Sequence, residues 1–491
     1  MSTQYGFYID SSRCTGCKTC ELACKDFKNL SPEVNFRRIY EYAGGDWTEQ
    51  DGVYTQNVFA YYLSISCNHC DDPACVKVCP SGAMHKREDG FVVVNEEVCI
   101  GCRYCHMACP YGAPQFDEVK GHMTKCDGCY ERVAEGKKPI CVGSCPLRAL
   151  DMAPIEELRA KYGDLAEIAP LPSAKYTKPN IVLKLNANSR PVTPPGIWLT
   201  QRRFKMGMGL HEWPLMFFTV IGQSVAGAFI IMGCAILSGK LPEALNRKVH
   251  YSMFGLWLLM GIGFLLSMIH MGTPMRAFNS FIRFGHSSLS NEIASGATFF
   301  ALGGLYWLIS VLNKMPAALG KLWLVVVMIL AVLFITAISR VYQIDTVPTW
   351  YNGYTTVNFV LTAFIGGPIL AALLMRIAGF NLNCISALPL LSVIAIIISA
   401  IVATSQGFEL GSIQTSVQKA VDLVPDYGFL MGIKLIALTL GLACWIAPLL
   451  RKNNPSVSLM VLGFILVFVG EFIGRGVFYG LHMTVGMAVV G

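Results

Sequence analysis

Sixteen cysteines lie between residues 14 and 145, in four groups with short and regular gaps. A gap of two residues lets one tight loop point three thiolates at a single iron–sulfur cube, while a fourth cysteine, displaced along the chain, binds a different cluster. This spacing predicts four clusters of the [4Fe-4S] type. The groups are Cys14, Cys17, Cys20, Cys24; Cys67, Cys70, Cys75, Cys79; Cys99, Cys102, Cys105, Cys109; and Cys126, Cys129, Cys141, Cys145.

The order of the groups along the chain indicates how they share ligands. We expect the two outer groups to pair with each other and the two inner groups to pair with each other, so that every cysteine is used once. The expected ligand sets are Cys14, Cys17, Cys20, Cys145; Cys24, Cys126, Cys129, Cys141; Cys67, Cys70, Cys75, Cys109; and Cys79, Cys99, Cys102, Cys105.

Two other uses of cysteine fit this pattern less well. Disulfides could employ sixteen cysteines, but neighbouring loops this tight cross-link poorly. Zinc accepts C-x-x-C pairs, yet it has no use for a third cysteine followed by a trailing C-P. The histidines between the cysteines replace no missing ligand, so we interpret them as hydrogen-bonding or surface groups. They are His69, His85, His106 and His122.

The 491 residues divide into two unlike halves. Charged residues make up only 14% of the chain, against roughly 25% in soluble domains. Residues 206–491 are dominated by apolar runs, and eight of these are long enough for a helix to span a bilayer core, which needs about 20 residues. The runs lie near 213–238, 250–271, 291–312, 321–341, 355–376, 386–406, 428–450 and 456–478.

We therefore predict an α+β, duplicated ferredoxin-like domain with four [4Fe-4S] clusters, joined to an all-α bundle of eight transmembrane helices. The expected boundaries are residues 1–165 for the cluster domain, 166–205 for a Pro-rich linker or arm, and 206–491 for the membrane anchor. The lipid bilayer is thus an expected partner. Nucleic acid is not, because the net charge of +7 forms no basic stripe with interleaved aromatic residues.

Lysine and arginine are unevenly distributed between alternate loops of the membrane half. By the positive-inside rule, the loops richer in these residues face the cytoplasm. An even number of spans then places the cluster domain on the periplasmic face of a bacterial inner membrane, although Arg202, Arg203 and Lys205 argue the opposite. Residues 1–13 show no targeting signal, so this placement requires export together with a partner.

Both halves resemble subunits of the dimethyl sulfoxide reductase family. Residues 1–190 resemble its four-cluster electron-transfer subunit at all sixteen ligand positions and at residues 187–191, although Lys25 stands where a proline usually follows the fourth cysteine. Residues 206–491 resemble its eight-helix anchor subunit. The segments that carry this second resemblance are 206–229, 272–279, 290–295, 345–351 and 474–482. Two normally separate subunits are therefore joined here in one chain.

Ionisable residues of the membrane half gather at the ends of the spans that face the cluster domain. Burying an ionisable group at membrane depth is costly, so each of these residues is a candidate functional residue. We predict His270 as the proton acceptor or ring-oxygen partner of a quinol, because its ordinary pKa suits neutral pH. Glu292 is expected to pass the proton to water, and Arg276 to neutralise or steer. The alternatives are an interfacial pair at His270 and Glu292, and a structural i, i+4 ion pair between Glu471 and Arg475.

The resemblance implies an electron-transfer and membrane-anchor component of an anaerobic respiratory reductase. Menaquinol would be oxidised in the membrane half without a haem, and electrons would pass through the clusters to a separate molybdopterin catalytic subunit that reduces dimethyl sulfoxide or other S- or N-oxides. The chain would then be a subunit of an oxidoreductase complex, not the catalyst for the terminal acceptor.

Two alternatives stay open at this point. The same modules occur in polysulfide, thiosulfate, tetrathionate, selenate and nitrite reductase systems. The second alternative belongs to another functional class: a ferredoxin domain docked on an ion-translocating membrane protein. It would predict charged residues through the middle of the bilayer, whereas here they stop at one side.

Overall fold

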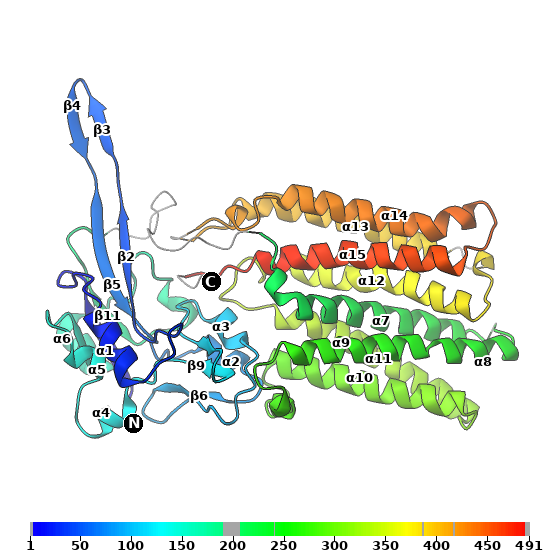
Figure 1. Cartoon of the computed structure of the whole chain (residues 1–491), viewed down its shortest axis with the longest axis horizontal. Helices are drawn as coiled ribbons and strands as arrows, with labels where there is room; N and C mark the ends of the chain where they lie inside the picture. Colours follow the sequence, from blue (N-terminus) through cyan, green and yellow to red (C-terminus); the bar gives the residue numbers. More distant parts are fainter. Residues whose placement is uncertain (1–2, 190–206, 240, 385–386, 416–417, 487–491) are drawn as a thin grey trace.

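A computed structural model describes residues 3–189, 207–239, 241–384, 387–415 and 418–486. A domain of short strands and helices lies at one end of a bundle of long helices (Figure 1). Among the described residues, eight helical segments are long and apolar enough to cross a membrane. The predicted fold class, a ferredoxin-type domain plus a helical membrane bundle, is therefore confirmed.

The central sheet of the soluble domain joins the two ends of that domain. Its middle strand, β1 (Tyr5–Asp10), pairs antiparallel with β10 (Leu150–Pro154) and parallel with β11 (Ile181–Lys184). Helix α6 (Ile155–Tyr162) covers this sheet. Because β11 lies inside the segment predicted as a linker, the domain extends to at least residue 184. Residues 190–205 of the predicted linker lie outside the described residues.

Short helices hold the cysteine loops, and five of them contain or directly follow cysteines. The turn before two of these helices requires a left-handed backbone: Lys18 and Arg103 have φ of 59° and nearly equal ψ, each directly after a cysteine. Equal geometry at corresponding loop positions supports the predicted duplication. The helices are α1 (Thr19–Phe27), α2 (Ala74–Val78), α3 (Tyr104–Ala108), α4 (Tyr130–Ala134) and α5 (Ile140–Gly143).

Three two-stranded ribbons complete the soluble domain. Residues 38–65 form a long antiparallel arm that projects from the body of the domain (Figure 1). Its base is buried, whereas Trp47 and Tyr54 near the tip are about two-thirds exposed. The arm is built from β2 (Arg38–Gly44) with β5 (Phe59–Ile65) and β3 (Trp47–Gln50) with β4 (Val53–Gln56); the smaller ribbons are β6 (Met84–Lys86) with β7 (Val92–Val94) and β8 (Gln115–Asp117) with β9 (His122–Thr124).

Helices α7 and α12 form the centre of the membrane bundle, because they are far more buried than the others. They approach closely where Gly227 meets Gly367, a contact of small residues typical of membrane helices. The predicted second span is broken into α8 and α9. The membrane helices are α7 (Trp213–Leu237), α8 (Glu243–Ser252), α9 (Phe254–Ile269), α10 (Ser288–Val311), α11 (Ala317–Val341), α12 (Gly353–Ile377), α13 (Ala387–Leu410), α14 (Tyr427–Leu450) and α15 (Val457–Gly480). Short 3-10 turns are η1 (Ala174–Tyr176), η2 (Leu210–Glu212), η3 (Pro274–Phe281), η4 (Leu382–Cys384) and η5 (Ala420–Asp422).

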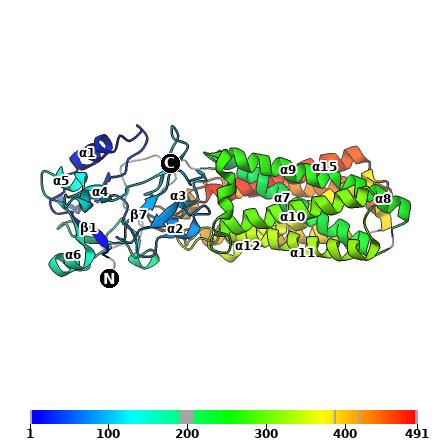
Figure 2. The ribbon, with the colours of Figure 1, turned by 90° about the horizontal axis from the view of Figure 1, so that it is seen from below.

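The two halves meet through backbone contacts along the loop between α9 and α10. Figure 2 shows α2 and α3 facing the end of the bundle. The N–H groups of Gly272 and Thr273 donate to the carbonyl oxygens of Gly101 and Ile100 at 3.4 and 3.3 Å. Ser287 Oγ donates to the Val78 carbonyl at 2.7 Å. The cysteine loops around residues 79 and 99–105 are therefore the part of the soluble domain that lies against the membrane half.

Candidate functional site

The structure brings the sixteen cysteines together as four separate sets. Three of the sets each line a cavity of their own, and in the remaining set Cys24, Cys126 and Cys129 all lie within electrostatic range of Cys141. The cavity-lining sets are Cys14, Cys17, Cys20, Cys145; Cys67, Cys70, Cys75, Cys109; and Cys79, Cys99, Cys102, Cys105. These groups coincide with the ligand sets expected from the sequence.

The chemistry of these sets suits a cluster better than the alternatives. All sixteen cysteines are free thiols. Within the described ranges, no three His, Cys, Asp or Glu side chains converge closely enough to hold a single metal ion, which zinc would require. Backbone N–H groups also donate to cysteine sulfur, from Met84 to Cys79 at 3.4 Å and from Ala149 to Cys145 at 3.3 Å. Such bonds stabilise cluster thiolates and tune their potential.

Two buried cations lie among the cysteine sets. Lys125 is 4% exposed, and its ammonium group donates to the Cys126 carbonyl at 2.7 Å. Arg37 is 1% exposed, donates to Ser64 and Ser66, and lies within electrostatic range of Cys20 and Cys141. Arg37 was not predicted from the sequence, because it lies outside the four cysteine groups along the chain.

Other ionisable residues near the cysteine groups have structural contacts. Arg103 stacks on the Phe116 ring with 4.0 Å to its centroid. Arg148 is exposed and donates to the Gly143 carbonyl at 3.2 Å. His69 Nδ1 accepts a hydrogen bond from the Val92 N–H at 3.0 Å, and burial lowers the pKa of His69 well below its usual value. His69 is therefore a neutral hydrogen-bonding group.

His270 lies at the junction of the two halves, against a second buried side chain. Its Nδ1 is 3.3 Å from Oε2 of Glu212, and both side chains are less than a tenth exposed. His270 also approaches the backbone of Cys102. Burial, together with the positive charge of Arg103, lowers the pKa of His270 to about 4. Its Nε2 has no hydrogen-bond partner among the described residues, so a neutral ring nitrogen is free to bind a donor.

Glu212 was not predicted from the sequence. It is the last residue of η2, directly before α7. At this position the sequence indicates only an acidic residue at the start of a helix. Only the fold shows that it is buried and placed beside a histidine that follows α9. The sequence feature that could have identified Glu212 is its position at the cluster-facing end of an apolar run.

Glu292 reaches the same junction from another helix. It is 4% exposed, one turn into α10, and lies within electrostatic range of Tyr104 in the Cys102–Cys105 loop. The Tyr104 hydroxyl in turn donates to the Val341 carbonyl at the end of α11. The structure therefore brings His270 and Glu292 to the same cysteine loop. Both side chains are buried more deeply than those of an interfacial pair, whose polar ends would reach out to water.

Arg276 has a different setting from the one expected. Its guanidinium group donates to the Glu96 carbonyl at 2.6 Å and to the Cys99 carbonyl at 3.4 Å, and the residue is half-buried. Arg283 similarly donates to the carbonyl oxygens of Val76 and Cys79. These arginines hold cysteine loops against the membrane half.

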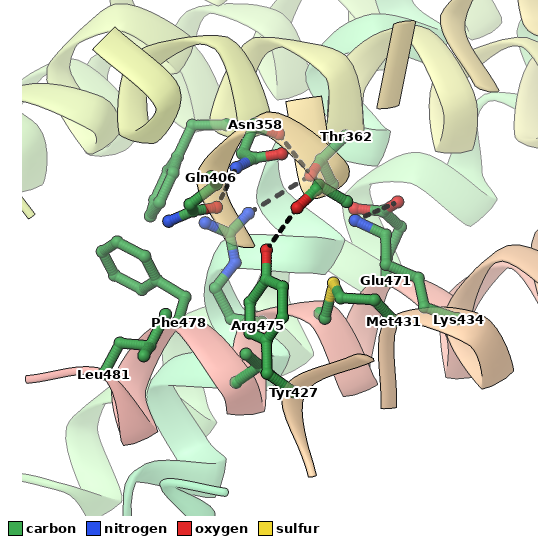
Figure 3. Close-up of a pocket in the computed structure, with 14 residues that line it drawn as sticks. Asn358, Thr362, Gln406, Tyr427, Met431, Lys434, Glu471, Arg475, Phe478 and Leu481 are labelled. Carbon is green, nitrogen blue, oxygen red and sulfur yellow. Dashed lines mark hydrogen bonds and ion pairs between the residues drawn. The ribbon is translucent and has the colours of Figure 1, made fainter. Parts of the chain in front are cut away.

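A second polar constellation lies inside the bundle, between α12, α13, α14 and α15. Figure 3 shows Thr362, Glu471 and Arg475 turned toward one another there. Glu471 makes an ion pair with Lys434 at 3.4 Å and accepts a hydrogen bond from the Thr362 hydroxyl at 2.6 Å. Arg475 donates to Gln223 at 2.8 Å. The ion-pair partner of Glu471 is thus Lys434 on a neighbouring helix, in place of Arg475 one turn along α15.

Comparison with known proteins gives matches to both halves. Residues 206–481 match the family described as DMSO reductase anchor subunit (DmsC), and residues 58–154 match the 4Fe-4S dicluster domain. The B subunit of anaerobic dimethyl sulfoxide reductase from Escherichia coli (strain K12) is 83% identical over 191 residues, covering 39% of this chain and 93% of that protein. The C subunit from the same organism is 55% identical over 285 residues, covering 58% of this chain and 99% of that protein. The C subunit from Haemophilus influenzae is 41% identical over 286 residues, covering 58% of this chain and 100% of that protein.

Proposed function

This chain belongs to the DMSO reductase anchor subunit family, with an iron–sulfur subunit joined to the anchor, and we propose that it oxidises menaquinol and conducts the electrons to a separate catalytic subunit. Each of the four cysteine sets would hold one [4Fe-4S] cluster. The partner would carry molybdopterin and reduce dimethyl sulfoxide or another S- or N-oxide.

One observation carries this proposal. His270 and Glu292 come from different membrane helices and meet the loop that holds Cys102 and Cys105. A quinol bound at His270 would lie beside the cysteine set of Cys79, Cys99, Cys102 and Cys105. Donor and first electron acceptor would thus be close neighbours, and such proximity favours transfer between them.

The side chains at this site suit removal of protons from a quinol. Oxidation of one quinol to a quinone releases two electrons and two protons. His270 Nε2 is positioned to accept a hydrogen bond from a quinol hydroxyl and to take its proton as the quinol is oxidised, while Glu212 beside Nδ1 orients the ring. Glu292 provides a second proton acceptor. When bound, the clusters supply one-electron steps, which divide the two-electron oxidation.

Electrons would leave at the opposite pole of the soluble domain. Cys17 is the exposed cysteine of the sixteen, and it belongs to the set of Cys14, Cys20 and Cys145. Leu22 and Leu147, each close in sequence to a cysteine of this set, are 63% and 42% exposed. An exposed cluster ligand between apolar side chains suits the docking of a protein electron acceptor.

A quinol assay on membranes tests the proposal. We expect His270→Leu to abolish reduction of the clusters by a naphthoquinol, while reduced benzyl viologen still reduces them directly. His286→Leu is the matched control, since His286 is exposed in the same loop and outside the site. Unchanged quinol oxidation by the His270 variant would refute the site.

The sidedness of the complex is a separate part of the proposal. The loop charges favour a periplasmic cluster domain, exported together with its partner. Protease added to intact spheroplasts should then digest the soluble domain. Digestion that requires inverted vesicles would place it in the cytoplasm.

A further inference from the structure

Three ionisable side chains lie deep inside the bundle, away from His270 and Glu292. Glu471, Arg475 and Lys434 are 3%, 4% and 7% exposed. Glu471 is nine residues before the end of α15 and Lys434 seven residues into α14, so they lie about 14 and 10 Å along their helices at 1.5 Å per residue. Ionisable groups at such depth are expensive, and they mark functional sites by default.

A small cavity lies beside these groups. Its volume is about 30 Å³, which suits one or two water molecules, because a water requires roughly 10–15 Å³ by this measure. It is therefore too small for a quinone ring system. Oε1 of Glu471 accepts no hydrogen bond from the described residues, although Lys434 is near it. Water in the cavity would satisfy this buried carboxylate oxygen.

Charge balance singles out one of the three groups. Glu471 and Arg475 carry opposite charges and balance each other. The ammonium proton of Lys434 is the additional charge, held close to Glu471 and facing the cavity. A buried lysine amine is a competent proton acceptor, unlike an arginine, which does not release its proton in proteins.

Two tyrosines lie near groups of both the cavity region and the quinol site. The hydroxyl groups of Tyr342 and Tyr479 are hydrogen bonded to each other. Tyr479 is one turn beyond Arg475 on α15, and it lies within electrostatic range of Arg475, Glu212 and Glu292. Gly209, which directly precedes η2, also packs against Tyr479, because a Cβ added to Gly209 would lie 2.5 Å from Cβ of Tyr479. The pair therefore lies near both buried polar regions, next to the cavity-lining residue Phe478.

We propose that Lys434, held by Glu471 beside the water-sized cavity, is a relay for one proton released by quinol oxidation. This inference rests on the proposed quinol oxidation at His270. Both electrons would go to the clusters, and one proton leaves by His270. The Lys434 ammonium releases its proton to the cavity water, toward the cluster-facing ends of α14 and α15, where Tyr427 and Leu481 line the cavity. The neutral Lys434 amine then takes up the second quinol proton, which Glu292 and the Tyr342–Tyr479 pair pass on.

An arginine in place of lysine separates this role from a structural one. Lys434→Arg keeps the positive charge and an ion pair with Glu471, but it cannot release a proton. We expect the saturated rate of cluster reduction by a naphthoquinol to fall about tenfold or more in Lys434→Arg and in Lys434→Met, within the range for general acid–base groups. The half-saturating naphthoquinol concentration should stay within about twofold, as should reduction by benzyl viologen.

The pH profile is the second readout. Around Lys434, the charged or titratable groups are Glu471 and Arg475 from α15 and Tyr427 from α14. The cavity neighbours from α12 and α13 are uncharged, namely Asn358, Thr362 and Gln406. We expect Lys434→Arg to remove one ionisation from the pH dependence of the saturated rate, which a merely structural ion pair would leave unchanged.

The controls make each outcome decisive. Lys419→Arg and Lys419→Met carry the same changes at an exposed position on the same face and should behave as the unaltered chain. If Lys434→Arg keeps its rate and pH profile, the relay is refuted while the quinol site stands. If the unaltered chain takes no electrons from naphthoquinol, the proposed function itself fails. Should Lys434→Arg not accumulate in membranes, Glu471→Gln is measured with Glu409→Gln as control, with the same expectation.

Discussion

Gly272 of the membrane half packs directly on Gly101 and Gly121 of the soluble domain. Its N–H faces the Gly101 carbonyl at 3.4 Å, and a Cβ added to Gly272 would collide with the Gly121 carbonyl oxygen. Gly101 follows Ile100 between two cysteines of the set nearest the membrane. The contact between the membrane half and this cysteine loop therefore depends on the absence of a side chain.

Gly272→Ala should push the cysteine loop away from His270. We expect the rate of cluster reduction by a naphthoquinol to fall by about tenfold or more, because a displacement of about 1 Å can cost that much in rate. Iron content and reduction by benzyl viologen should stay unchanged. Gly304→Ala is the control, since a Cβ there meets nothing within 4 Å. An unaltered quinol rate in Gly272→Ala would show that the junction tolerates the extra methyl group.

Arg37 should set the potential of the clusters near it. Removing a buried positive charge disfavours the reduced, more negative form of a neighbouring cluster. We therefore expect Arg37→Gln to lower the midpoint potential of one or both clusters built on Cys20 and Cys141 by tens of millivolts, where about 59 mV corresponds to a tenfold change for one electron. Redox titration followed by electron paramagnetic resonance measures this. Arg148→Gln, at an exposed arginine, should leave every potential in place.

The projecting arm should contribute to attachment of the catalytic subunit. Trp47 and Tyr54 bury little surface in this chain, and the arm residues 41–57 carry Glu41, Asp46, Glu49 and Asp51 but no basic residue. A basic surface with apolar patches would complement it. We expect the double variant Trp47→Ser, Tyr54→Ser to keep its clusters and its quinol activity with dye acceptors, but to lose much of the co-purifying partner. Val119→Ser, another exposed apolar position, is the control. Full recovery of the partner would exclude this role of the arm.

The contact between α7 and α12 should be intolerant of larger side chains. A Cβ on Gly227 would collide with the Ala363 carbonyl oxygen. Overpacking at such a site costs about 1–3 kcal/mol for small additions, and more for a leucine that separates two backbones. Gly227→Leu should therefore reduce the amount of folded protein in membranes, measured by its resistance to protease, whereas Gly304→Leu should not. Normal protease resistance would show that the central helices can separate.

Much of the architecture follows from local pattern. Cysteine gaps of two residues produce a recognisable cluster loop wherever they occur, so the ligand identities could be proposed before the fold was known. The eight spans were also predictable to within a few residues at most ends, because a bilayer core demands a minimum apolar length. The exception is the second span, in which the break at Met253 separates α8 from α9.

The sites themselves depend on which side chains meet. Sequence alone placed His270, Glu292 and Glu471 at the correct end of their spans, since spans alternate in direction. It did not show that Glu212 lies against His270, that Glu471 pairs with Lys434 on another helix, or that Arg37 reaches the cysteines. Periodicity along one helix reports which residues share its face, whereas contacts between residues tens to hundreds of positions apart arise only from the packing of helices and loops. Burial, and with it the charge state of each group, is decided by that packing.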